Sequence, residues 1–246
     1  ADYRLDYELR ITDCKFKSDG TEFKANSYDF KTNLIGEFNI YNAAAAICAA
    51  LSQNIPIEQI QKSLLSFQPP AGRMEVINMG QDFSVIIDYA HEPKSLESVY
   101  KAVIDSKLKT HNSKLICLLG AAGGGRDKWK RPEMGKISAQ YCDEIILANE
   151  DPYDESPNRI LLDIKSGIKN SELRIKNVHE IIDRKEAIQK AISLAKKGDA
   201  VVLTGKGGEV WMCVENGKKI SWNEKEIVEE ILNQRIAFIK LKTELK

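Results

Sequence analysis

The residues best suited to bind a ligand lie between positions 120 and 131, where a run of glycines leads into four basic side chains: Gly120, Gly123, Gly124, Gly125, then Arg126, Lys128, Lys130 and Arg131. Glycine allows positive φ and close approach of a ligand, and free backbone N–H groups beside a helix start attract anions. The segment has neither the G-x-x-x-x-G-K-[ST] pattern nor the G-x-G-x-x-G spacing. It therefore predicts an anion-binding loop of another kind, with a solvated turn as the alternative.

Three more loops with charged or glycine residues each follow an apolar stretch: Asp88–Pro93, Asn149–Glu155 and Gly205–Glu209. A guanidinium binds a carboxylate in bidentate geometry, and carboxylates bind an ammonium, so this mixture suits a zwitterion. We expect Asp88 to contact a ligand, because a carboxylate at a strand end can accept two ribose hydroxyls. The alternatives are a helix cap for Asp88, a surface histidine for His91 and a solvated acidic loop at 150–155.

The elements that would position these loops alternate between strand and helix from residue 74 onward. We expect strands at 75–79, 83–88, 115–119, 144–147, 172–175 and 200–203, helices at 93–108, 132–140, 158–168, 183–197 and 224–232, and a hairpin around Asn216–Gly217. This order predicts an α/β fold with a mostly parallel sheet covered by helices on both faces. Ligands of such sheets bind at the carboxyl ends of the strands, so Asp88, Arg126, Asp151 and Glu209 should surround one cleft.

Residues 1–72 follow another pattern. Residues 1–35 alternate weakly between apolar and polar, which indicates an antiparallel meander. An alanine-rich helix follows at 43–51, with Asn42 as its possible cap, and a shorter helix at 57–67. The prolines and glycine of Gln68–Arg73 break structure, so we expect two domains, 1–72 and 73–246.

The composition excludes several classes of protein. The 36 basic and 36 acidic residues cancel, which argues against a nucleic-acid or anionic-membrane binder. We find no membrane-spanning run and no signal peptide. The five cysteines form no C-x-x-C pair, and most lie in apolar runs, so we expect buried free thiols in a reducing compartment, the cytoplasm. Trp129 is expected to pack against the protein, and the start at Ala1 indicates a fragment.

Five segments, taken in order, resemble the Mur ligases: Gly36–Ala46, Gly72–Glu75, Asp88–Pro93, Gly124–Gly135 and Gly205–Glu209. The resemblance covers essentially the whole chain and is greatest to members that add the third amino acid to UDP-N-acetylmuramoyl-L-alanyl-D-glutamate in peptidoglycan synthesis. It implies an amide ligase that uses ATP and magnesium, in which an acyl phosphate is attacked by the incoming amine. It also implies that 1–72 ends a central ATPase domain and that 73–246 is a Rossmann-like carboxy-terminal domain.

The resemblance also implies residue roles. Asn42 would contact adenine, Arg73 and Asp88 the nucleotide and its ribose, and His91 would act near the phosphates. No metal ligand is assigned in this chain. The pocket for the incoming amino acid would be formed by Arg126, Glu150, Asp151, Pro152, Tyr153, Gly205 and Glu209.

Two departures from the family pattern matter. The phosphate loop, the carbamoylated lysine and the UDP-binding domain are absent from this sequence, so we do not expect the chain to catalyse ligation alone. Diaminopimelate-adding members carry Asp-Asn-Pro-Arg where this chain has Glu150-Asp151-Pro152-Tyr153. Loss of one partner of a buried charge pair costs about 2–5 kcal/mol, so lysine or another diamino acid is an alternative to diaminopimelate. A folylpolyglutamate-type ligase and a non-catalytic binding module are the competing interpretations.

Overall fold

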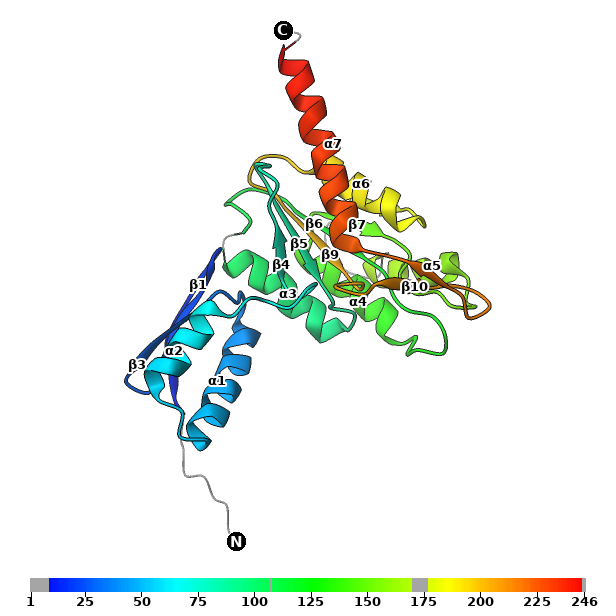
Figure 1. The fold of residues 1–246 in the computed structure, drawn as a ribbon. Coiled ribbons are helices and arrows are strands. Elements are labelled where there is room, and N and C mark those ends of the chain that lie inside the picture. The colour runs from blue at the N-terminus through cyan, green and yellow to red at the C-terminus, as the bar shows by residue number, and fades with distance from the viewer. Residues whose placement is uncertain (1–8, 107, 170–176, 245–246) are drawn as a thin grey trace. The chain divides into compact units, whose positions relative to one another are not determined.

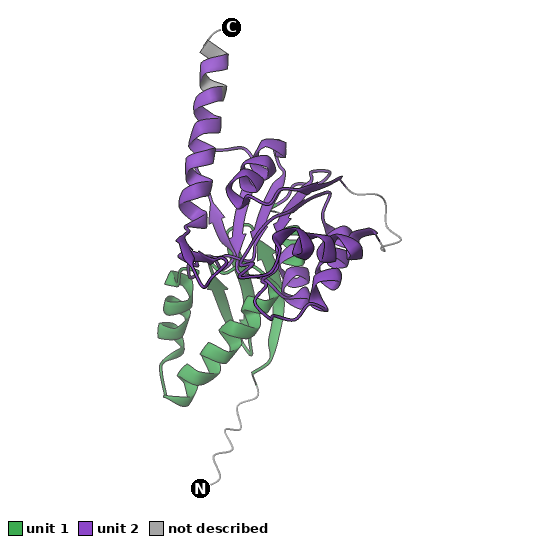
Figure 2. Ribbon diagram, turned by 90° about the vertical axis from the view of Figure 1, so that its right-hand side faces the viewer, with its two compact units in different colours: residues 1–69, 101–108 green, residues 70–100, 109–246 purple. Residues whose placement is uncertain are grey.

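The computed structural model describes residues 9–106, 108–169 and 177–244, which form two compact units (Figures 1 and 2). Unit 1 contains the chain up to Pro69 together with Lys101–Leu108. Unit 2 contains Pro70–Tyr100 and the chain from Lys109 onward.

Unit 1 is an antiparallel sheet with two helices. Its strands β1 (Ile11–Lys17), β2 (Gly20–Ala25) and β3 (Tyr28–Thr32) pair in sequence order, as the alternating pattern predicts. The helices are α1 (Glu37–Ser52) and α2 (Ile57–Ser66). Phe23 stacks on Phe30 with ring centroids 5.6 Å apart, and these rings share a core with Ile47 and Ile60.

Helix α1 begins earlier than the sequence suggested. Its N-cap is Gly36, at φ 101°, so Asn42 lies inside the helix and is not its cap. The amide of Asn42 donates a hydrogen bond to Asn39 Oδ1 at 3.0 Å. The helix extends to Glu37 because this first turn buries Asn39 and Ile40.

Unit 2 is built on a six-stranded sheet with the order β4-β5-β9-β6-β7-β8. The strands are β4 (Glu75–Ile77), β5 (Ser84–Asp88), β6 (Leu115–Leu119), β7 (Glu144–Leu147), β8 (Asn177–Glu180) and β9 (Ala200–Thr204). All neighbours pair in parallel except β4, which is antiparallel to β5. The expected strand at 172–175 lies outside the described residues. The remaining strands, β10 (Trp211–Cys213) and β11 (Lys219–Ser221), form the expected hairpin, in which Asn216 and Gly217 both have positive φ.

Helices cover both faces of this sheet, which confirms the predicted fold class (Figure 1). They are α3 (Pro93–Asp105), α4 (Lys130–Tyr141), α5 (Pro157–Lys169), α6 (Arg184–Leu194) and α7 (Glu224–Glu244). Helices α6 and α7 pack on one face, where Ile188 and Val228 join a core with Val85, Leu118 and Val201. Helix α4 begins at Lys130, so Pro132 is its third residue and not its first.

Two expectations from the sequence are wrong: that the cysteines are buried free thiols, and that Trp129 packs against the protein. Cys117 and Cys142 form a disulfide, because β6 and the C-cap of α4 bring their α-carbons within 6.0 Å. Cys213 is a buried free thiol, but Cys14 is exposed. Trp129 does not pack against the protein: it is 66% exposed, because it sits at the N-cap of α4.

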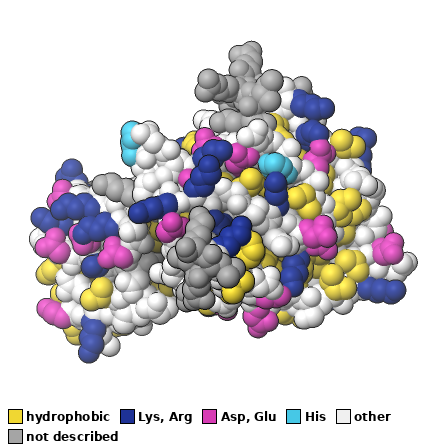
Figure 3. Space-filling model, turned by 90° about the horizontal axis from the view of Figure 1, so that it is seen from above, with side chains coloured by type: hydrophobic (Ala, Val, Ile, Leu, Met, Phe, Trp, Pro, Cys, Tyr) yellow, Lys and Arg dark blue, Asp and Glu magenta, His cyan; other side chains and the backbone are white. Residues whose placement is uncertain are grey.

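Acidic and basic side chains are interspersed on the face seen in Figure 3, in keeping with the zero net charge. Among the residues that the structure describes, no helix is both long and apolar enough to cross a membrane.

The close packing of α4 against α5 generates a stability prediction. A Cβ at Gly167 would lie 1.8 Å from the carbonyl oxygen of Pro132, so Gly167→Ala must push the two helices apart. Overpacking costs about 1–3 kcal/mol, which exceeds the gain of about 1 kcal/mol from placing alanine in a helix. We expect a lower free energy of unfolding in urea, whereas Asn158→Ala, at an exposed position of the same helix, should change it little. An unchanged value for Gly167→Ala would contradict this packing.

Candidate functional site

The predicted ligand-binding loops leave the sheet of unit 2 at one edge. Strands β5, β9, β6 and β7 are neighbours, with Asp88 opposite Thr204 and Leu119 opposite Leu147 in register. The four loops that follow these strands therefore start side by side, as the rule for parallel sheets predicts.

A buried lysine joins two of these loops. The side chain of Lys206 is fully buried, and its Nζ donates hydrogen bonds to Asp151 Oδ1 at 2.9 Å and Oδ2 at 3.0 Å, and to Glu209 Oε2. Glu209 Oε1 in turn accepts a hydrogen bond from the hydroxyl of Tyr89 at 3.0 Å, which adds the loop after β5. Sequence reasoning missed Lys206, although a lysine flanked by glycines directly after a buried strand was a visible signal.

Asp151 also fixes the acidic loop to its other neighbours. Its Oδ1 accepts the backbone N–H of Cys213 at 2.7 Å. Its carbonyl oxygen accepts the N–H of Gly123 at 2.8 Å. The acidic loop is therefore bound to the glycine loop on one side and to β10 on the other.

Glycine is required where the loops approach one another. A Cβ at Gly123 would lie 2.1 Å from the carbonyl oxygen of Pro152, and one at Gly205, where φ is 105°, would lie 2.3 Å from Glu150 Oε2. A Cβ at Gly72 would meet Gly208 N at 1.9 Å, so the segment that carries Arg73 packs against the loop after β9.

Glu150 is not a surface residue of a solvated loop. It is 5% exposed, and its Oε2 has no hydrogen-bond partner among the described residues. Burial raises the pKa of Glu150 to about 6, against the opposing effect of the Arg184 and His91 charges. The carboxyl group therefore lies in the interior of the loop cluster.

Arg126 and Tyr153 lie at the exposed side of this cluster. Arg126 is exposed, and its guanidinium interacts with the Tyr153 hydroxyl. Hydrogen bonding to Cys213 and burial raise the pKa of Tyr153, whereas Arg126 lowers it. Tyr153 has φ of 50°, which is uncommon for a side chain of its size, and its ring would meet a Cβ at Gly124 at 2.7 Å.

Arg131, the most deeply buried cation of the glycine segment, forms a bidentate pair with Glu155. Its two terminal nitrogens lie 2.8 and 2.9 Å from the Glu155 oxygens, and one also donates to the Ala122 carbonyl at 3.2 Å. This pair lowers the pKa of Glu155 to about 2. Of the acidic loop's four carboxylates, Asp151 and Glu155 are thus paired with cations of the protein, and Asp154 accepts the N–H of Asn216.

The residues predicted for nucleotide binding within unit 2 lie close together in the structure. Both carboxylate oxygens of Asp88 accept backbone N–H groups, from Met74 and Ala90, at 2.8 Å. Arg73 lies over the ring of Tyr89 at 4.7 Å, and the Tyr89 and His91 rings make an edge contact at 4.8 Å. Asn42 belongs to unit 1, so its predicted contact with adenine stays a prediction.

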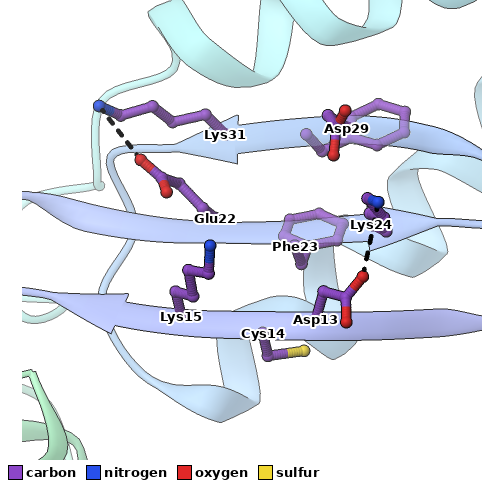
Figure 4. Close-up of a pocket in the computed structure, with 9 residues that line it drawn as sticks. Asp13, Cys14, Lys15, Glu22, Phe23, Lys24, Asp29 and Lys31 are labelled. Carbon is purple, nitrogen blue, oxygen red and sulfur yellow. Dashed lines mark ion pairs between the residues drawn. The ribbon is translucent and has the colours of Figure 1, made fainter.

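Each unit also has a pocket that is lined in part by charged side chains. A pocket of about 540 Å³ on the sheet of unit 1 is lined by charged side chains that pair with one another, such as Lys24 with Asp13 and Lys31 with Glu22 (Figure 4). A second, of about 510 Å³, lies beside Tyr153 and between the acidic loop and Val214–Asn216. Within the described ranges, no three or more His, Cys, Asp or Glu side chains cluster in a way that could hold a metal ion.

Comparisons with known proteins agree with the resemblance seen in the sequence. Residues 72–207 match the model described as "Mur ligase, glutamate ligase domain", and residues 3–50 match the Mur ligase middle domain. The chain is 43% identical over 210 residues to a UDP-N-acetylmuramoyl-L-alanyl-D-glutamate–2,6-diaminopimelate ligase of Aquifex aeolicus, covering 85% of this chain and 41% of the relative. It is 42% identical over 232 residues to a UDP-N-acetylmuramyl-tripeptide synthetase of Borreliella burgdorferi, covering 93% and 44%.

Solved structures lead to the same group. A UDP-N-acetylmuramoyl-L-alanyl-D-glutamate–2,6-diaminopimelate ligase aligns with a TM-score of 0.63 at 30% identity, covering 95% of this chain and 47% of that chain. A folylpolyglutamate synthase of Mycobacterium tuberculosis aligns with a TM-score of 0.62 at 17% identity, covering 81% and 46%, which shows a shared fold only. This chain therefore spans less than half the length of these relatives.

The burial of Glu150 predicts a pH effect on stability. Because its folded pKa of about 6 exceeds the ordinary value of 4.5, the folded state binds more protons between these pH values. The stability that protonated Glu150 contributes is complete below pH 4.5 and is lost as pH rises through 6, by about 2 kcal/mol. Relative to the wild type, Glu150→Gln should therefore become more stable between pH 4.5 and 7.5, as measured by urea unfolding.

Glu155→Gln provides the control of opposite sign. The pKa of Glu155 is lowered, so its stabilising effect is present above pH 4.5 and is lost as pH falls toward 2. A pH-independent difference between Glu150→Gln and the wild type would show that Glu150 does not titrate in a buried site.

Proposed function

Because the chain belongs to the Mur ligase family, we propose that it supplies the amino-acid-binding site of an ATP-dependent ligase of peptidoglycan precursor synthesis. The ligase joins a diamino acid to UDP-N-acetylmuramoyl-L-alanyl-D-glutamate. ATP phosphorylates the substrate carboxylate, the amine attacks the acyl phosphate, and ADP and phosphate leave. Similar relatives carry names that state this ligation, which supports the proposal.

The observation that carries the proposal is that an exposed cation and a cluster of net negative charge belong to loops that follow the neighbouring strands β6, β7 and β9. Arg126 offers a guanidinium to the α-carboxylate of the incoming amino acid. Asp151 and Glu209 together carry two negative charges against the single charge of Lys206, so the cluster can attract an ammonium group. Glu209 is the more exposed of the two carboxylates, with 31% of its side chain accessible.

Arg73, Asp88 and His91 are the proposed contacts of unit 2 with ATP, and Asn42 is the proposed contact of unit 1 with adenine. Tyr89 contacts both basic residues: its ring makes an edge contact with the His91 ring, and the Arg73 guanidinium lies over it. Two groups able to carry positive charge therefore lie beside one aromatic ring. Magnesium would neutralise phosphate charge during transfer, but the described residues offer no cluster to hold it. ATP and the UDP-linked substrate place the reaction in the cytoplasm.

The amino acid is proposed to be lysine or another diamino acid that ends in an ammonium, with diaminopimelate as the alternative. Tyr153 presents a neutral hydroxyl, which cannot form a bidentate ion pair with a second carboxylate. Tyr153 also lines a pocket of about 510 Å³, in which Glu155 is already paired with Arg131, and the described lining residues include no lysine or arginine that could receive a second carboxylate. Both features favour a side chain that ends in an ammonium alone, as in lysine, over one that carries a second carboxylate beside it, as in diaminopimelate.

Ligation by the complete gene product that carries this chain tests the proposal. We expect release of ADP that depends on both UDP-N-acetylmuramoyl-L-alanyl-D-glutamate and lysine, or another diamino acid with a terminal ammonium. Strong selectivity for diaminopimelate would overturn the choice of amino acid. Turnover with a folate and glutamate only would favour a folylpolyglutamate-type ligase, and no turnover with either pair would favour a binding module.

Arg126 provides a sharper prediction for the same assay. Hydrogen bonds to charged groups contribute about 1.5–3 kcal/mol, so Arg126→Ala should raise KM for the amino acid about 10- to 100-fold. KM for ATP should stay near the wild-type value, because Arg126 is assigned to the amino acid alone. Lys197→Ala, which removes an exposed cation just before β9 begins, is the matched control and should change neither value. Equal KM values for the amino acid in all three proteins would contradict the assignment.

A further inference from the structure

We propose that Arg184 is a positioning residue that sets the spacing of the amino-acid site, acting through the backbone carbonyls of Asn149 and Thr204. This inference rests on the proposed function. Asn149 directly precedes Glu150 and Asp151, and Thr204 directly precedes Gly205 and Lys206. Arg184 therefore holds both chains at the points where they enter the site.

The contacts of Arg184 are specific and fully buried. Its side chain is 0% exposed, and its terminal nitrogens donate to the Thr204 carbonyl at 2.8 Å and to the Asn149 carbonyl at 3.1 Å. Nε and a terminal nitrogen also donate to the two oxygens of Glu224, at 2.9 and 2.6 Å. One guanidinium thus joins two strand ends of the sheet to the first residue of α7.

The local sequence explains why this guanidinium points inward. Asp183 is the N-cap of α6 and accepts the N–H of Glu186 at 2.9 Å, so Arg184 is fixed as the first residue of the helix. Glu224 Oε2 also accepts the indole N–H of Trp222 at 2.8 Å. Both ends of the ion pair are therefore held by neighbours in their own segments.

Only arginine can make all of these contacts at once. A guanidinium has five N–H donors in a fixed plane. In Arg184 it donates four hydrogen bonds, which go to the Asn149 carbonyl, the Thr204 carbonyl and the Glu224 carboxylate. A lysine ammonium is a compact point charge that cannot span two carbonyls and a carboxylate in this geometry. The two carbonyls would then lose their shared donor. The distance between the segments that carry Asp151 and Lys206 would no longer be fixed by Arg184.

A purely structural role is the competing interpretation, because the same ion pair attaches α6 and α7 to the sheet. The two roles can be separated. Removing one partner leaves a buried charge unpaired, whereas replacing both partners with apolar side chains of similar volume often restores stability. The double replacement still removes the donor from the Asn149 and Thr204 carbonyls.

The experiment compares Arg184→Met, the double variant Arg184→Met/Glu224→Met and Arg184→Lys in the complete gene product. Thermal unfolding and KM for the amino acid and for ATP are measured for each protein. We expect Arg184→Met to lower Tm clearly and the double variant to recover most of the loss. KM for the amino acid should remain raised about 10- to 100-fold in the double variant and in Arg184→Lys, with KM for ATP unchanged.

The matched control is Lys185→Met/Glu230→Met, which removes a neighbouring exposed ion pair between the same two helices, at 2.8 Å. It should leave Tm and both KM values near those of the wild type. The positioning role would be overturned if the double variant recovered both its Tm and a wild-type KM for the amino acid. If the double variant did not fold, a wild-type KM for the amino acid in Arg184→Lys would overturn it. A wild-type protein without amino-acid-dependent turnover would instead overturn the proposed function, and this inference with it.

Discussion

The arrangement of the site depends on one buried ammonium. The side chain of Lys206 is fully buried, and an unpaired charge in that position would cost several kcal/mol. Asp151 and Glu209 therefore have to stay beside it, although they belong to loops that follow different strands. Glu209 also accepts a hydrogen bond from Tyr89, so the loop after β5 has to stay beside Glu209 as well. A single buried charge thus links three loop segments.

Two buried arginines apply the same constraint to the neighbouring segments. Arg131 holds the carbonyl of Ala122 in the glycine loop and the carboxylate of Glu155 in the acidic loop. Arg184 holds the carbonyl of Asn149, at the start of the acidic loop, and the carbonyl of Thr204, at the end of β9. Arg126, by contrast, is exposed in the loop that follows β6. The internal charges fix the geometry, and the exposed charge is available to a ligand.

The sequence predicted those parts of the fold that depend on local pattern. The strands at Leu115–Leu119 and Glu144–Leu147 have their predicted bounds, because central parallel strands are apolar on both faces. The predicted alternation of strands and helices in a parallel sheet already put these loops at one edge, whereas the position of β9 between β5 and β6 was not predicted. The Mur ligase resemblance is confirmed, because five spaced motifs carry more information than any single loop.

The sequence did not predict features that depend on tertiary contacts. Burial of Lys206 and Glu150 cannot be read from their neighbours in the chain, because the surrounding groups come from other strands. The pairing of Cys117 with Cys142 likewise depends on where β6 and α4 meet. Asn42 was taken as a cap because asparagine favours that position, but the packing of Ile40 and Asn39 extended the helix beyond it. The roles assigned to the site residues by resemblance remain predictions.

A crystal structure of this chain grown with a diamino acid would test the central claim most directly. We predict that the α-carboxylate lies within hydrogen-bond distance of the Arg126 guanidinium and that the amino acid lies at the carboxyl ends of β6, β7 and β9. The Lys206 contacts with Asp151 and Glu209 should be retained in that complex. An amino acid bound away from Arg126, or a Lys206 side chain released to solvent in the complex, would contradict it.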